Sequence, residues 1–452
     1  MSMKKKVLAV TVGASLLVPS FGAISAHEHG DAPAPTVETD AVELRSTLDH
    51  YLSEHVFLAV EAMRKGADGA EDFEAAANAL NANTEDLSAA IASVYGDEAG
   101  EQFQGMWEDH IGFFVDYVMA TAEDDEEGRQ QALDELAEYR TEFSQFLESA
   151  TDERLEAESL ADGLQMHVDQ LIGAFDSYVA GDFETAYEYE REAMHHMYMV
   201  SKGLSTAITD QFEDDFNGET PATAAGDLRS DLNYLLSEHA GLAVVAMQNG
   251  IDGADDFEAS AQALNNNTED LSAAIASVFG EEAGNQFEQM WADHIGHFVS
   301  YVEATGAEDE EAQEEALAML DEYRAEFSEF LDTATEGRVA ADGLSQGLQE
   351  HVNQLIGSFD SYVAGDYEAA YADAREAYGH MFMPAKGLSG AFVDQFPEEF
   401  AHDMPSDMPE TGLAPADQGG MSATMLTMMV VGLFAVMAAS GIMLTKVNRK
   451  NA

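Results

Sequence analysis

Apolar residues recur at steps of three and four along most of the chain, which is the spacing of one buried stripe on an α-helix. The stripe is clearest over 164–178. Ala, Glu, Leu, Gln and Met dominate these segments, and runs of β-branched residues are absent. The pattern predicts helices near 41–65, 70–81, 84–95, 97–122, 125–149, 153–180 and 182–213. Thr84 and Asp182 are predicted to be N-caps.

The chain contains one long unit twice. The segment "LRSTLDHYLSEH" at 44–55 matches "LRSDLNYLLSEH" at 228–239, a shift of 184 residues. The shift holds without a gap as far as "TDQF" at 209–212 and "VDQF" at 393–396. Because this period is far longer than a solenoid repeat, each copy is expected to be a domain with its own core. The predicted fold class is all-α: two tandem homologous helical-bundle domains and a C-terminal hydrophobic helix.

The same pattern divides the chain into segments. They are a signal peptide at 1–26, an acidic and histidine-containing tail at 27–40, the first bundle at 41–216, a linker at 217–227, the second bundle at 228–400, a stalk at 401–420, a hydrophobic span at 421–445 and a basic tail at 446–452.

The N-terminal segment has the layout of a secretory signal peptide. Three lysines precede an apolar run from Val7 to Phe21, and small residues follow in "GAISA". We expect cleavage after Ala26, with cleavage after Ser25 as the alternative. The protein is therefore predicted to be exported.

The C-terminal segment carries a second targeting pattern. An apolar run from Ala423 to Leu444 is long enough to span a bilayer, and the tail "KVNRK" would stay in the cytoplasm. Before the run lies Met408-Pro409-Glu410-Thr411-Gly412. The order of motif, span and basic tail resembles the LPXTG-like cell-wall sorting signal of Gram-positive surface proteins, with Met408 where leucine is usual.

The resemblance implies two partners and a location. Sortase would cut between Thr411 and Gly412 and join the threonine to peptidoglycan, so that the membrane holds the chain only before processing. The alternative is an ordinary C-terminal membrane anchor. Both place the body of the protein outside the cell.

Composition excludes several functions. The chain has 19 Lys+Arg against 87 Asp+Glu, a formal net charge of −68, and no cysteine. Nucleic acid is excluded as a partner because phosphate contacts need clustered cations. Disulfides, thiolate metal sites and covalent c-type haem are excluded because they need cysteine. An acidic, solvated surface of this kind suits a salty or alkaline habitat.

Four histidines of the first copy have counterparts in the second. The pairs are His55 and His239, His110 and His294, His167 and His351, and His196 and His380. Each lies on a different predicted helix, in or beside its apolar stripe, and bundle cores hold metals or haem with inward side chains of this kind. The alternative is that each histidine simply packs in the core. His195, which the second copy replaces with Gly379, is expected to face outward.

Methionines lie beside the last of these histidines. The predicted metal ligands are the eight paired histidines together with Met197, Met199, Met381 and Met383. Thioethers beside imidazoles favour copper. A zinc site made of imidazoles alone and a non-covalent haem held by His or Met remain open, as does a core-filling role for the methionines.

Three further paired segments carry a family resemblance. "NTEDLSAAIASV" occurs in both copies, as do "MW.DHIG" and "QLIG.FDSYVAGD". They resemble repeat domains of secreted and wall-anchored Bacillus-type proteins that carry a copper amine oxidase label. Copper amine oxidases make a quinone from the Tyr of an Asn-Tyr-Asp/Glu motif, whereas Tyr234 is followed by Leu235. We therefore expect a wall-anchored copper-binding protein without oxidase activity. The alternatives are an acidic structural or adhesive surface protein and a haem-binding surface protein.

Overall fold

A computed structural model describes residues 34–401, and over that range every regular element is an α-helix. The all-α prediction is therefore confirmed. None of the helices within 34–401 is long and apolar enough to cross a membrane. The predicted signal peptide, sorting motif, hydrophobic span and basic tail lie outside the described residues.

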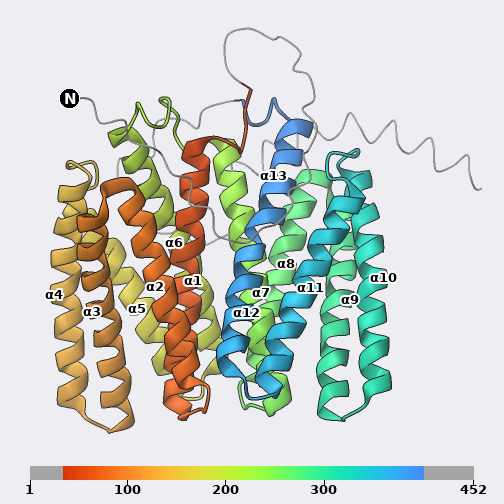
Figure 1. The fold of residues 1–452 in the computed structure, drawn as a ribbon, viewed down its shortest axis with the longest axis horizontal. Coiled ribbons are helices and arrows are strands. Elements are labelled where there is room, and N and C mark those ends of the chain that lie inside the picture. The colour runs from red at the N-terminus through yellow and green to blue at the C-terminus, as the bar shows by residue number, and fades with distance from the viewer. Residues whose placement is uncertain (1–33, 402–452) are drawn as a thin grey trace, which may run out of the picture.

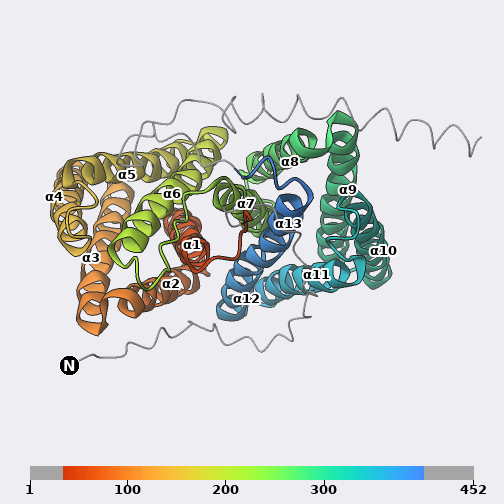
Figure 2. The ribbon, with the colours of Figure 1, turned by 90° about the horizontal axis from the view of Figure 1, so that it is seen from above.

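The first copy folds into six antiparallel helices with short connections (Figure 1). They are α1 (Asp40–Asp68), α2 (Phe73–Tyr95), α3 (Asp97–Ala122), α4 (Glu126–Ala150), α5 (Ala157–Val179) and α6 (Phe183–Gln211). Each helix packs on the next, and α6 packs back on α1, so that the six helices close a ring (Figure 2).

The second copy repeats this arrangement with one interruption. Its helices are α7 (Ala224–Asp252), α8 (Phe257–Phe279), α9 (Glu281–Gly306), α10 (Glu310–Ala334), α11 (Ala341–Val363), α12 (Tyr367–His380) and α13 (Phe382–Gln395). Together α12 and α13 correspond to α6, with the break at Met381. The cause is Pro384, which replaces Val200: proline has no N–H to donate to the carbonyl of His380 and its ring clashes with that carbonyl.

Two details of the predicted helix pattern are wrong. The expected helices at 70–81 and 84–95 form the single helix α2, and Thr84 is no N-cap, because its hydroxyl donates to the carbonyl of Leu80 within that helix. The polar run that suggested a break has a tertiary role instead. Asn83 is buried and donates to the Tyr51 carbonyl and to Glu54. Asp182 takes the N-cap position of α6, as predicted, but its side chain accepts no capping hydrogen bond.

The two copies are packed against each other rather than separated by a linker. Helix α1 contacts α7, α2 contacts α12 and α6 contacts α8. One hydrophobic cluster contains Phe57 of α1, Val245 of α7 and Tyr378 of α12, whereas a second lies wholly in the second copy. The expectation of a fully separate core for each copy is therefore wrong at the shared face. The linker is also shorter than predicted, since α7 begins at Ala224.

Candidate metal centre

Three buried imidazoles meet in the middle of the first bundle. His55 comes from α1, His110 from α3 and His167 from α5, and His55 is only 1 % exposed. The centroid of the His55 ring lies 5.3 Å from that of His110 and 6.0 Å from that of His167. Each histidine lies on the apolar stripe of an amphipathic helix, and the closed ring of helices turns all three stripes inward.

The second bundle contains the same constellation. The His239 ring lies 5.2 Å from that of His294 and 6.0 Å from that of His351. The Nε2 atoms of His239 and His294 are 3.3 Å apart. Two nitrogens bonded to one tetrahedral ion at about 2.0–2.1 Å are themselves about 3.3 Å apart. The same distance is that of a hydrogen bond, in which one of these Nε2–H groups donates to the other Nε2. The spacing would also suit two neighbouring ligands of a single ion.

Most nitrogens of the two clusters have no hydrogen-bond partner. Both nitrogens of His55 are buried without one, as are the Nδ1 atoms of the other five histidines. A neutral imidazole carries one N–H donor and one acceptor, and an unpaired buried polar group costs about 1–3 kcal/mol. Coordination of a metal ion by the lone pairs would satisfy the acceptors. The chemistry of these donors, though not yet their arrangement, is therefore suited to a transition metal.

The rings do not yet form a complete coordination shell. Within residues 34–401, no three or more His, Asp or Glu side chains are arranged so as to hold a metal ion. With centroids up to 6.0 Å apart, the third ring would have to turn about its side-chain bonds before three nitrogens reached one point. The three helices thus bring three imidazoles close together without arranging them as a coordination shell.

The fourth histidine pair has a different role. The Nε2 of His196 lies 3.0 Å from the Gly163 carbonyl, and that of His380 lies 3.0 Å from the Gly347 carbonyl. A carbonyl only accepts, so these Nε2 atoms carry the proton and donate. His196 borders the cluster but is tied to α5, which makes it a neighbour of the three meeting imidazoles.

The four methionines that were predicted as ligands differ in how deeply they are buried. Met197 and Met381 are buried and line the cavities of their bundles. Met199 is half-buried, and Met383 is 52 % exposed. The structure therefore does not bring Met383 to the imidazoles, although it shares the i, i+3 spacing with His380. Outward-facing His195 is exposed as expected, and its ring packs 4.9 Å from that of Tyr234.

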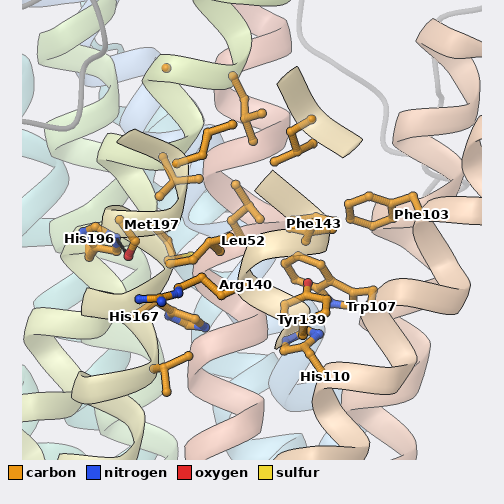
Figure 3. Close-up of a pocket in the computed structure, with 18 of the residues that line it drawn as sticks. Leu52, Phe103, Trp107, His110, Tyr139, Arg140, Phe143, His167, His196 and Met197 are labelled. Atoms are coloured by element: carbon orange, nitrogen blue, oxygen red, sulfur yellow. Dashed lines mark hydrogen bonds between the residues drawn. The ribbon is translucent and has the colours of Figure 1, made fainter. Parts of the chain in front are cut away.

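Each cluster borders a small apolar cavity (Figure 3). In the first bundle His167, His196 and Met197 approach it from one side and His110 from the other. The cavity measures about 70 Å³, and its counterpart about 50 Å³. Binding pockets for drug-sized ligands measure about 300–1,000 Å³. Haem would therefore require the helices to separate, whereas a metal ion would not.

Sequence reasoning missed the aromatic side chains around the cluster. Trp107 lies one turn before His110, and its ring is 4.8 Å from that of His55 and 4.6 Å from that of His110. Tyr139 stacks on His110 at 5.0 Å. Trp291 and Tyr323 repeat these contacts in the second copy. The only sequence signal for them was that each is the same residue type in both copies. Any aromatic residue of the core could show the same repetition.

Burial keeps the clustered histidines neutral. It lowers the pKa of His110, His294 and His351 to about 3, and it lowers the pKa of His55, His167 and His239 well below the usual value. Neighbouring imidazoles add to the effect at His55, His167 and His239. Neutral imidazole is the form that binds a metal.

These pKa values predict a loss of stability in acid. Because the folded-state pKa of His110 and His294 lies below the unfolded value near 6.5, the unfolded chain takes up protons first. Their contribution is complete above pH 6.5 and is lost as the pH falls toward 3. When the pH of the metal-free protein falls from 7 to 5, the free energy of unfolding of the wild type should decrease because of these two histidines. In the double variant His110→Leu and His294→Leu that decrease should be smaller by up to about 4 kcal/mol. Urea unfolding at both pH values measures this difference, and equal losses would contradict it.

Comparisons of the chain with protein-family models, with curated proteins and with solved structures give no match.

Proposed function

We propose that this is an exported, wall-displayed protein that binds one transition-metal ion, with copper favoured, in each helical bundle. The observation that carries the proposal is the meeting of three buried, neutral imidazoles from three helices, twice in one chain. The first-copy ligands would be His55, His110 and His167. Those of the second copy would be His239, His294 and His351.

The donor set supports copper or zinc among the metals available outside a cell. Imidazole is a good ligand for both, whereas magnesium and calcium prefer oxygen ligands, and no Asp or Glu of residues 34–401 lines either cavity. Met197 and Met381 line the same cavities and add soft sulfur near the site, which favours copper. The role that we propose for the clusters is metal binding.

Display on the wall rests on the sequence. The signal-peptide pattern and the order of Met408–Gly412, apolar span and basic tail support export followed by sortase attachment to peptidoglycan. A body with so large a negative charge would also concentrate cations near its surface. The two features together would place a metal-binding protein where ions reach the cell first.

A structural or adhesive role is the second candidate. The observation that favours it is the commitment of His196 and His380 to backbone carbonyls, which shows that histidines in these bundles can serve packing alone. In that case the six clustered histidines would be core residues, and metal ions would leave the stability of the fold unchanged.

Thermal unfolding with and without copper separates the two roles. At free copper 100 times above the dissociation constant, a site is expected to add about 2.7 kcal/mol to the free energy of unfolding. The Tm should therefore rise by several degrees. The rise should disappear in a variant with His110→Leu and His294→Leu and persist with His195→Ala. An equal rise in all three proteins would mean that copper binds to surface carboxylates.

A further inference from the structure

The face between the two copies is built from reciprocal contacts. Arg191 of the first copy donates to Glu238 and Asp270 of the second, at 3.0 and 2.7 Å. Arg375, its counterpart 184 residues on, donates to Glu54 and Asp86 at 2.9 and 2.8 Å. Those two acids are the counterparts of Glu238 and Asp270. Such exchange is the mark of an isologous, twofold interface.

Other ion pairs on this face follow the same rule. Arg45 pairs with Asp227, and Arg229 pairs with Glu43. Seven of the thirteen Lys and Arg between 34 and 401 form ion pairs between the two copies: Arg45, Arg64, Arg191, Lys202, Arg229, Arg375 and Lys386. Two strongly acidic bundles repel each other, and the chain places its few cations where the bundles touch.

Two positions meet their own counterparts and therefore lie on the pseudo-twofold axis. Phe57 faces Gly241, where an added Cβ would lie 3.2 Å from the Phe57 ring. Asn233 donates to the carboxylate of Asp49 at 3.2 Å. Both contacts lie on α1 and α7, which stand side by side in the centre of the molecule (Figure 2).

At the axis the two copies carry different residues, and the residue of one copy fits the residue of the other. Pairing two first copies would set Phe57 against a second Phe57 and buried Asp49 against a second Asp49. Pairing two second copies would set Gly241 against Gly241 and leave a void. Only the mixed pair combines one phenylalanine with one glycine and one carboxylate with one amide donor. Clashes and like charges that reject a wrong partner are a known source of specificity.

A third contact, away from the axis, shows the same matching. A Cβ on Gly379 would lie 2.9 Å from the His50 ring, so His50 needs glycine there. The equivalent contact joins Tyr234 and His195, whose rings lie 4.9 Å apart. His195 and Gly379 therefore differ because one faces Tyr234 and the other faces His50. The difference does not involve the histidine clusters.

We propose that the two copies are a complementary pair: the face of each recognises the other copy and rejects a second copy of its own kind. The interface keeps the reciprocal ion pairs of a symmetric dimer, and Phe57/Gly241 and Asp49/Asn233 at its axis make the pairing mixed. This inference does not depend on metal binding.

Exchange of the axial residues within the full chain tests the proposal. Asn233→Asp should lower the Tm strongly because two buried carboxylates then meet, whereas Asp49→Asn should have a small effect. The double variant Asp49→Asn with Asn233→Asp restores one carboxylate and one amide, and most of the lost Tm should return. Gly241→Phe and the exchange Phe57→Gly with Gly241→Phe should behave in the same way. If either exchange is as unstable as its worse single variant, the two copies are not matched across an axis.

Cleavage between the copies gives an independent readout that needs no core substitution. A protease site placed at 217–220, which is largely exposed, allows the folded chain to be cut after it has formed. We expect the halves to stay together as one pair in gel filtration and native mass spectrometry at nanomolar concentration. Separation of the halves on cutting would overturn the proposal.

Discussion

Replacing Arg64 with methionine is expected to lower the free energy of unfolding by about 3–5 kcal/mol. Arg64 is 5 % exposed and donates to both carboxylate oxygens of Glu61 at 2.9 and 3.0 Å. It also donates to Asp256 at 2.7 Å and to Asn249 at 2.8 Å across the face between the copies. Without the guanidinium, two buried carboxylates lose their counter-charge, and this desolvated charge is the source of the loss.

Urea unfolding of the variant measures the loss, and Arg338→Ala is the matched control. Arg338 pairs with Glu336 at the surface, where an ion pair contributes about 0–1 kcal/mol. A further variant uses the second copy as its template, since Val245 and Gln248 stand there in place of Glu61 and Arg64. Arg64→Gln with Glu61→Val should be less damaging than Arg64→Gln alone. A loss below about 1 kcal/mol for Arg64→Met would contradict the account of this buried network.

Replacing His110 with leucine is expected to reduce tightly bound copper from two ions per chain to one. The two clusters lie in separate bundles and share no ligand, so the second site should keep its affinity. Within the first bundle, loss of one imidazole leaves two ligands and an apolar cavity that offers no replacement. Leucine fills much of the vacated volume, which limits the cost to the fold.

Metal analysis after exposure to a competing chelator measures the number of tight ions. The chelator is needed because the many carboxylates on the surface of so acidic a chain are expected to hold copper weakly. His195→Ala removes an exposed histidine and should leave two ions, whereas His110→Leu with His294→Leu should leave none. Two ions in the double variant would show that the tight sites lie elsewhere.

The helices could be predicted from the sequence because their amphipathic period is strong and survives local exceptions. The prediction of a helix boundary failed where a polar residue forms hydrogen bonds to another helix. Asn83 looks like a turn residue, but its amide bonds to α1, and so α2 continues through it. The break at Met381 was likewise not predicted, although Pro384, which has no N–H for the hydrogen-bond ladder of a helix, is present in the sequence.

The candidate site was predictable only in part. The four histidine pairs were visible as repeats, and three of the four meet in each bundle. Which side of α6 faces the cluster was not visible, because a residue and its i+3 neighbour point about 60° apart around a helix, enough to bury His196 and leave Met199 only half-buried. The face between the copies was missed altogether. A shift of 184 identifies counterparts, but it does not say which of them touch.

X-ray absorption spectroscopy of the chelator-washed, copper-loaded protein tests most directly whether the clustered imidazoles act as one site. Ring scattering from imidazole distinguishes histidine nitrogen from carboxylate and water oxygen in the first shell of the metal. The structure leads us to expect three imidazole nitrogens per copper, with His55, His110 and His167 as the source in the first bundle. A first shell made only of oxygen atoms would contradict this arrangement and leave the six histidines as core residues.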